Sequence, residues 1–275
     1  MNHTVLLVLC AAILLGITSG ILGCFALLRQ QSLLGDAISH AALPGIVLMF
    51  LCTYNANPWM LLCGGALTGI IGVMCMNYIY VHTKLKKDAI LGIILSVFFG
   101  LGLVLMTIVQ KIPIASQAVL NKFLFGTIST VLVHDIKLIA VLSCFILCVL
   151  YVLWKECMAY TFDPVFVHMI GLQTHIIEKV LTMLLILAIV IGLQTVGVVL
   201  MSTMLIAPAA AARQWVCRFP SMVMLSAFLG GFSAATGVYL SSVIDHMPTG
   251  PSIVVVASMI VFISLIWSPK REMAS

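Results

Sequence analysis

The chain has 275 residues, of which 63% are hydrophobic and 8% are charged, and its mean hydropathy is +1.25. Soluble domains carry about 25% charged residues, so this composition excludes a soluble protein and indicates a polytopic membrane protein. The net charge of +5 does not indicate a nucleic-acid partner, because the Lys and Arg residues lie in short loops between apolar runs. No polar block is long enough to fold by itself, so we expect residues 1–275 to form a single transmembrane domain.

Apolar runs of about 20 residues follow one another along the chain, and each can cross a bilayer as an α-helix. We therefore predict an all-α fold with about nine transmembrane helices, in a range of eight to ten. The expected spans are 3–28, 33–53, 59–82, 89–109, 135–154, 176–200, 202–212, 220–243 and 252–267. The less hydrophobic stretch 110–134 is expected to lie partly in the membrane interface.

The basic residues predict which ends of these spans face the cytoplasm. With the spans above, Lys111, Lys122 and Lys137 fall on one side and the other ten Lys and Arg residues on the opposite side. The strongest basic loop is Lys84-Leu85-Lys86-Lys87. Because basic residues are retained in the cytoplasm, we expect an external N-terminus and a cytoplasmic C-terminus, with membrane lipid around the spans.

The second expected span carries an aspartate and a histidine four residues apart, Asp36 and His40. An aspartate at the centre of a membrane helix costs roughly 2.5 to 3.5 kcal/mol, and such residues usually face a protein interior or a water-filled path. Positions i and i+4 share one face of a helix. A carboxylate and an imidazole are ligands for a divalent first-row metal, so the pair is a candidate metal site. The alternative is a buried Asp–His hydrogen bond that only holds two helices together.

Small residues accompany this pair. Ala37, Ala41 and Gly45 form a stripe that permits close helix approach, and we expect it to serve pore packing. Pro44 has no N–H to bond the carbonyl oxygen of His40, which leaves that oxygen free to face a cavity.

The longest polar connection is residues 155–179, and its length in a loop-poor chain indicates a docking surface. Asp163 can cap a short helix that has Pro164 at its first position, and Gly171 is a typical helix stop. We expect an amphipathic helix at the cytoplasmic surface; a plain connector is the alternative. The residues expected to take part in docking, and so to couple the chain to a cytoplasmic partner, are Thr161, Phe162, Asp163, Pro164, Phe166 and Gly171.

Enzymatic motifs do not occur in the sequence. The zinc-protease motif His-Glu-x-x-His is absent, and so is the phosphate loop Gly-x-x-x-x-Gly-Lys-Ser/Thr. We therefore predict a non-enzymatic subunit, and any ATP hydrolysis would have to come from a separate partner.

The segments Gly35-Asp36-Ala37-Ile38-Ser39-His40-Ala41 and Leu43-Pro44-Gly45 resemble the signature of the bacterial manganese, zinc and iron ABC-importer permeases. Further segments match this family in order and spacing, so the resemblance covers nearly the whole chain. These are Leu124-Phe125-Gly126, Thr161-Phe162-Asp163-Pro164 with Gly171-Leu172, and Leu205-Ile206-Ala207-Pro208-Ala209-Ala210-Ala211.

The resemblance implies a membrane subunit of a dimeric importer in the bacterial cytoplasmic (inner) membrane, similar in fold to the vitamin-B12 and siderophore permeases. It implies a second permease subunit, identical or paralogous, a cytoplasmic ATPase dimer that binds ATP, and an extracytoplasmic metal-binding protein. The residues that the resemblance implies for coupling to this ATPase are Thr161, Phe162, Asp163, Pro164, Phe166 and Gly171. No permanently bound cofactor is implied, because manganese, zinc or iron is the cargo. Asp36 and His40 offer two ligands, whereas a stable site for a divalent ion needs four to six, and a second subunit would supply two more.

Two other functions remain open at this point. A proton-coupled secondary metal transporter could use Asp36 and His40 as a relay, since both groups titrate and both lie within an expected span. Relays usually need further stations, and Asp36 is the one acidic residue well inside a span. A structural membrane subunit without transport leaves the buried aspartate unexplained.

Overall fold

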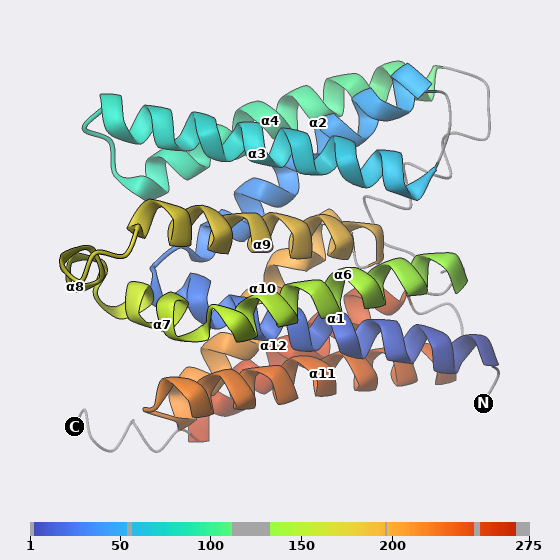
Figure 1. Cartoon of the computed structure of the whole chain (residues 1–275). Coiled ribbons are helices and arrows are strands. Elements are labelled where there is room, and N and C mark those ends of the chain that lie inside the picture. The colour runs from blue at the N-terminus through green and yellow to red at the C-terminus, as the bar shows by residue number, and fades with distance from the viewer. Residues whose placement is uncertain (1–2, 54–56, 112–132, 196, 245–247, 268–275) are drawn as a thin grey trace. The chain divides into compact units, whose positions relative to one another are not determined.

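The computed structural model describes residues 3–53, 57–111, 133–195, 197–244 and 248–267 (Figure 1). Within these ranges every regular element is an α-helix, which confirms the predicted all-α fold. The stretch expected at the membrane interface and the motif Leu124-Phe125-Gly126 fall almost entirely on residues 112–132, outside the described residues, so their placement stays a prediction.

Each of the nine predicted spans corresponds to a helix. The helices are α1 (His3–Leu28), α2 (Ser32–Thr53), α3 (Pro58–His82), α4 (Lys87–Gln110), α6 (Val133–Val152), α7 (Trp154–Phe162), α8 (Pro164–Met169), α9 (Thr174–Thr195), α10 (Val198–Trp215), α11 (Phe219–Val243) and α12 (Thr249–Trp267). The spans predicted at 3–28 and 59–82 agree with α1 and α3 to within a residue.

Seven helices in the described part of the chain are long and apolar enough to cross a membrane: α1, α2, α3, α4, α9, α11 and α12. An eighth candidate is the pair α6 and α7, which is bent by 72° at the break between them. These numbers lie at and just below the lower limit of the predicted range. The short span predicted at 202–212 lies within α10, an 18-residue helix that contains Pro208 and ends in the polar turn Arg213-Gln214-Trp215. With these polar residues at its end, α10 is not among the seven candidate spans.

Contacts divide the chain into two units, and the first consists of residues 1–32, 128–188 and 203–275. In this unit α1, drawn in blue, runs beside α11, drawn in orange (Figure 1). The Ser226 hydroxyl of α11 donates a hydrogen bond to the Gly20 carbonyl oxygen of α1 at 2.7 Å. A Cβ atom at Gly20 would lie 2.6 Å from the Ser226 carbonyl oxygen, so only glycine permits this approach. The pair is therefore joined by backbone contacts as well as by side chains.

The second unit consists of residues 33–127 and 189–202, and it contains nearly all of α2 together with α3 and α4. Helix α2 contacts α3 at two small residues, because a Cβ atom at Gly64 would lie 2.5 Å from the Gly45 carbonyl oxygen. The Thr68 hydroxyl of α3 donates to the Gly64 carbonyl oxygen at 3.2 Å and lies 3.5 Å from the Ala42 carbonyl oxygen of α2. This packing fixes which side of α2 is covered within the unit.

Candidate metal-ion site

Helix α2 presents Asp36 and His40 on its less covered side. Both side chains are half-buried, whereas the intervening residues Ala37, Ile38 and Ser39 are buried. The helical repeat of 3.6 residues explains the difference, since positions four apart share a face and their neighbours turn away from it. The two candidate ligands therefore lie on one face of α2, and both residues are partly exposed.

His40 has an unsatisfied ring nitrogen. Its Nδ1 atom is buried, and the described residues, Asp36 included, offer it no hydrogen-bond partner. The ring packs edge-on against Phe99 of α4, with 4.6 Å between the ring centroids. Asp36 lies close enough to His40 for an electrostatic interaction. A buried polar atom without a partner costs about 1 to 3 kcal/mol. A cation bound between the His40 Nδ1 atom and the Asp36 carboxylate would remove that cost.

A metal ion needs more ligands than this pair supplies. Within the described ranges, no three or more His, Cys, Asp and Glu side chains come together in a way that could hold a metal ion. Each subunit was expected to provide two ligands. In the described residues, no other acidic, His or Cys side chain joins Asp36 and His40 to make a set of three. Water, backbone oxygens or a second subunit would have to complete the shell.

The small-residue stripe packs inside the second unit. The side chain of Ala41 is 1% exposed, and its Cβ atom would lie 2.9 Å from a Cβ atom at Gly72 of α3. Pro44 lies 3.4 Å from the position of a Cβ atom at Gly102 of α4, and Gly45 meets the backbone of Gly64. Ala37 is also buried. The stripe thus holds α2 against α3 and α4, and a role in lining a pore stays a prediction.

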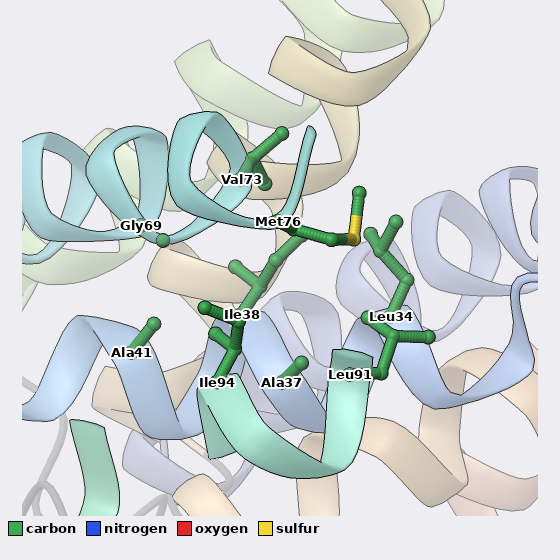
Figure 2. Close-up of a pocket in the computed structure, with 10 residues that line it drawn as sticks. Leu34, Ala37, Ile38, Ala41, Gly69, Val73, Met76, Leu91 and Ile94 are labelled. Carbon is green, nitrogen blue, oxygen red and sulfur yellow. The ribbon is translucent and has the colours of Figure 1, made fainter. Parts of the chain in front are cut away.

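A small cavity of about 10 Å³ lies beside this stripe (Figure 2). Its lining is apolar and comes from α2, α3 and α4: Leu34, Ala37, Ile38, Ala41, Gly69, Gly72, Val73, Met76, Leu91 and Ile94. Asp36 and His40 do not line it. A cavity this small, without a carboxylate or an imidazole, is unsuited to a metal ion, so the candidate site is on the other face of α2.

The predicted start and stop of the short helix in 155–179 are confirmed. The Asp163 Oδ1 atom accepts a hydrogen bond from the Phe166 backbone N–H at 2.9 Å, and Pro164 is the first residue of α8. Helix α8 ends at Met169, and Gly171 follows with a φ of 84°, in the left-handed region that favours glycine.

The surface around α8 is apolar and exposed. Phe166 is 52% exposed and Met169 is 74% exposed. Phe162, at the end of α7, is exposed as well, and the preceding Thr161 donates its hydroxyl to the Cys157 carbonyl oxygen at 2.7 Å. The residues before Asp163 were expected to belong to a polar connection, but in the structure they form helix α7.

These observations define a helical, multi-pass membrane protein with a carboxylate and an imidazole on a membrane-spanning helix, which is the class to which transport permeases belong. Residues 1–268 match the family described as the ABC 3 transport family, and the chain belongs to that family. It is accordingly a multi-pass protein of the bacterial inner membrane.

Two curated relatives are 42% identical to the chain. One is the manganese transport system membrane protein MntC of Bacillus subtilis, matched over 268 residues, which are 98% of this chain and 62% of the relative. The other is the zinc transport system membrane protein TroC of Treponema pallidum, matched over 270 residues, which are 98% of this chain and 91% of the relative. The chain thus spans less than two thirds of the Bacillus relative and most of the Treponema one.

A solved structure has the same fold. It is PsaBC from Streptococcus pneumoniae in complex with Fab, and the matched chain superposes with a TM-score of 0.87 at 31% identity. The match covers 99% of this chain and 94% of that one. The predicted family resemblance and fold class are therefore confirmed.

Proposed function

We propose that this chain is the membrane-spanning permease subunit of an ATP-driven importer that moves a divalent transition metal into the cell. The observation that carries the proposal is the pair Asp36 and His40 on one face of α2, with the buried Nδ1 atom of His40 unpaired among the described residues. Among the described residues, no Asp36–His40 hydrogen bond occupies that nitrogen. An arriving cation would use it, together with the Asp36 carboxylate.

Two copies of the site would give a divalent ion enough ligands. One subunit supplies a carboxylate and an imidazole, so a second permease subunit facing it across a central path would bring the side-chain ligands to four. The chain would also need an ATPase pair on the cytoplasmic side, because it carries no phosphate loop. An extracytoplasmic metal-binding protein would deliver the ion.

The two relatives that are 42% identical to this chain do not decide between manganese and zinc. The manganese relative and the zinc relative are both 42% identical to this chain over almost its full length. Carboxylate and imidazole ligands accept manganese, iron or zinc, and the Irving–Williams order favours zinc in binding strength alone. Selection among these metals would then rest on the delivering protein.

Uptake by reconstituted vesicles tests the proposal. The chain is co-expressed with its ATPase, and uptake of radiolabelled manganese, zinc and iron is measured with and without ATP. Asp36→Asn and His40→Gln should abolish uptake while leaving insertion and ATPase association unchanged. Asp88→Asn and His82→Gln, which alter exposed groups at the ends of α4 and α3, are matched controls that should transport normally.

Two outcomes would contradict parts of this assignment. Wild-type uptake rates in Asp36→Asn or His40→Gln would leave the pair a structural feature. Uptake that needs a proton gradient and continues without ATP would instead support the proton-coupled transporter, with Asp36 and His40 as relay.

A further inference from the structure

Arg29 stands at a rigid helix end. The N–H of Gln31 donates to the Ala26 carbonyl oxygen at 2.9 Å, and the N–H of Gln30 donates to the Leu27 carbonyl oxygen at 3.1 Å. Gln30 has a φ of 56°. This is the hydrogen-bond pattern of a Schellman motif, which fixes the backbone at the end of α1. The Arg29 side chain is only 9% exposed, so its charge must be satisfied by the protein.

Two other helices satisfy that charge. The Arg29 Nη2 atom donates to the Glu178 Oε1 atom of α9 at 3.4 Å. The guanidinium carbon lies 5.1 Å from the ring centroid of Tyr160, a buried residue of α7. A guanidinium can hold a carboxylate at its edge while its charge faces an aromatic ring. Arg29 therefore joins α1, α7 and α9.

An aromatic cluster connects two of the same helices, α1 and α7, to α11. Phe25 of α1 lies 6.0 Å from Trp154 of α7 and 5.1 Å from Phe219 of α11, measured between ring centroids. Phe162, at the end of α7, lies 5.5 Å from Phe219. The ion pair itself is buried on the Arg29 side only, because the Glu178 side chain is 41% exposed.

The two partners of Arg29 lie on either side of α8 in the chain. Tyr160 precedes Asp163, the N-cap of α8, and Glu178 follows Gly171, where the chain leaves it. Arg29 thus fixes both ends of the segment that carries the exposed apolar surface of α8. We propose that Arg29 is a positioning residue that couples displacement of α8 to α1, and through the glycine contacts of α1 to α11. This rests on the proposed function, with the added expectation that the exposed apolar surface of α8 docks on the partner ATPase.

A second carboxylate belongs to the same junction. The Oε2 atom of Glu156 in α7 is buried and has no hydrogen-bond partner among the described residues. Glu156 and Arg29 both lie within electrostatic range of the buried Cys157 thiol. The neighbourhood of Cys157 therefore holds the Arg29 cation and the Glu156 carboxylate.

Metal uptake and ATP hydrolysis, measured in the same vesicles, test the coupling. Arg29→Gln and Glu178→Gln should lower the number of metal ions moved per ATP by about fivefold or more, while hydrolysis stays within about twofold of wild type. The exchange Arg29→Glu with Glu178→Arg should recover much of the lost ratio. Lys179→Gln removes an exposed cation next to Glu178 and is the matched control, expected to leave the ratio unchanged.

A pair of changes at Tyr160 keeps the test informative if Arg29→Gln fails to assemble. Tyr160→Phe retains the ring but removes the hydroxyl that interacts with Arg29 and Glu178, so it should lower the ratio less than Tyr160→Leu, which removes both and should behave like Arg29→Gln. Thermal unfolding and ATPase co-purification are measured for every variant. A merely structural junction would lower stability, uptake and hydrolysis together and leave the ratio of uptake to hydrolysis constant.

Different results would contradict the coupling role of Arg29 and the proposed function. If the wild-type complex takes up no manganese, zinc or iron with ATP, the proposed function is wrong. If it does, and the ratio of uptake to hydrolysis is unchanged in Glu178→Gln and Tyr160→Leu, Arg29 has no coupling role.

Discussion

Gly20 shows how much a single missing side chain matters in this molecule. Its backbone oxygen accepts the hydrogen bond from Ser226, and the Ser226 carbonyl oxygen lies only 2.6 Å from where a Cβ atom would be. Gly92 and Gly100 of α4 are the opposite case, because a Cβ atom at either would meet nothing within 4 Å. All three glycines lie in α-helices, but only Gly20 is in close contact with another helix.

Gly20→Ala should lower the free energy of unfolding by about 1 to 3 kcal/mol, since the inserted methyl group forces α1 from α11. Gly92→Ala should leave it unchanged or raise it by up to about 1 kcal/mol, because alanine favours the helix more than glycine does. Thermal unfolding of the purified protein in detergent measures both changes. Equal unfolding temperatures for the two variants would show that the α1–α11 contact is not close.

The candidate site could be predicted at this scale, and the junction at Arg29 could not. An aspartate and a histidine in an apolar run are conspicuous because membrane helices seldom contain them, and their spacing places them on one face. In the sequence Arg29 is one of the ten basic residues on the expected cytoplasmic side, and nothing distinguishes it from the other nine. Its partner Glu178 is 149 residues away, and nothing local in the sequence joins them.

Helix α8 is an element whose limits are set locally. Asp163 caps it, Pro164 begins it and Gly171 ends it, so the sequence was sufficient to predict it. Helix α7 was not predicted, because contacts with distant parts of the chain stabilise it. Trp154 stacks on Phe219, and Arg29 covers Tyr160. A helix held in this way has no signature in its own residues.

Gly171 allows a test of this element without touching its surface. A Cβ atom there would meet nothing within 4 Å, so any effect of substitution comes from the φ of 84°. Gly171→Val should cost about 1 to 2 kcal/mol and weaken ATPase association several-fold, whereas Gly171→Asn should be tolerated because asparagine adopts this conformation. Co-purification of the ATPase measures the difference. Wild-type association of Gly171→Val would indicate that α8 is a plain connector.

At the scale of the whole molecule, the membrane spans could be predicted because apolar runs of about 20 residues are direct signals. The division into two units could not be predicted. It depends on which helices pair, and α1 pairs with α11 through glycine and serine contacts that many membrane helices could make. A single sequence does not specify such pairings.

Orientation in the membrane follows from charge and can be measured directly. Cys217 is exposed and lies between α10 and α11, beside Arg218, in a loop expected inside the cell. A variant that keeps only Cys217 of the nine cysteines should react with a membrane-impermeant maleimide only in inside-out vesicles. Asn57→Cys in a cysteine-free background should react only in intact cells. The reverse labelling would contradict the predicted external N-terminus.

The contact between Gly20 and Ser226 also has a consequence for biogenesis. The two residues are 206 positions apart, so at about 5 to 20 residues per second a ribosome needs roughly 10 to 40 s to supply the second after the first. Throughout that interval the newly inserted α1 displays its glycine-lined face to lipid or to the insertion machinery. Completion of the first unit is therefore one of the last events of synthesis, and a chain that stops before α11 leaves α1 available for degradation.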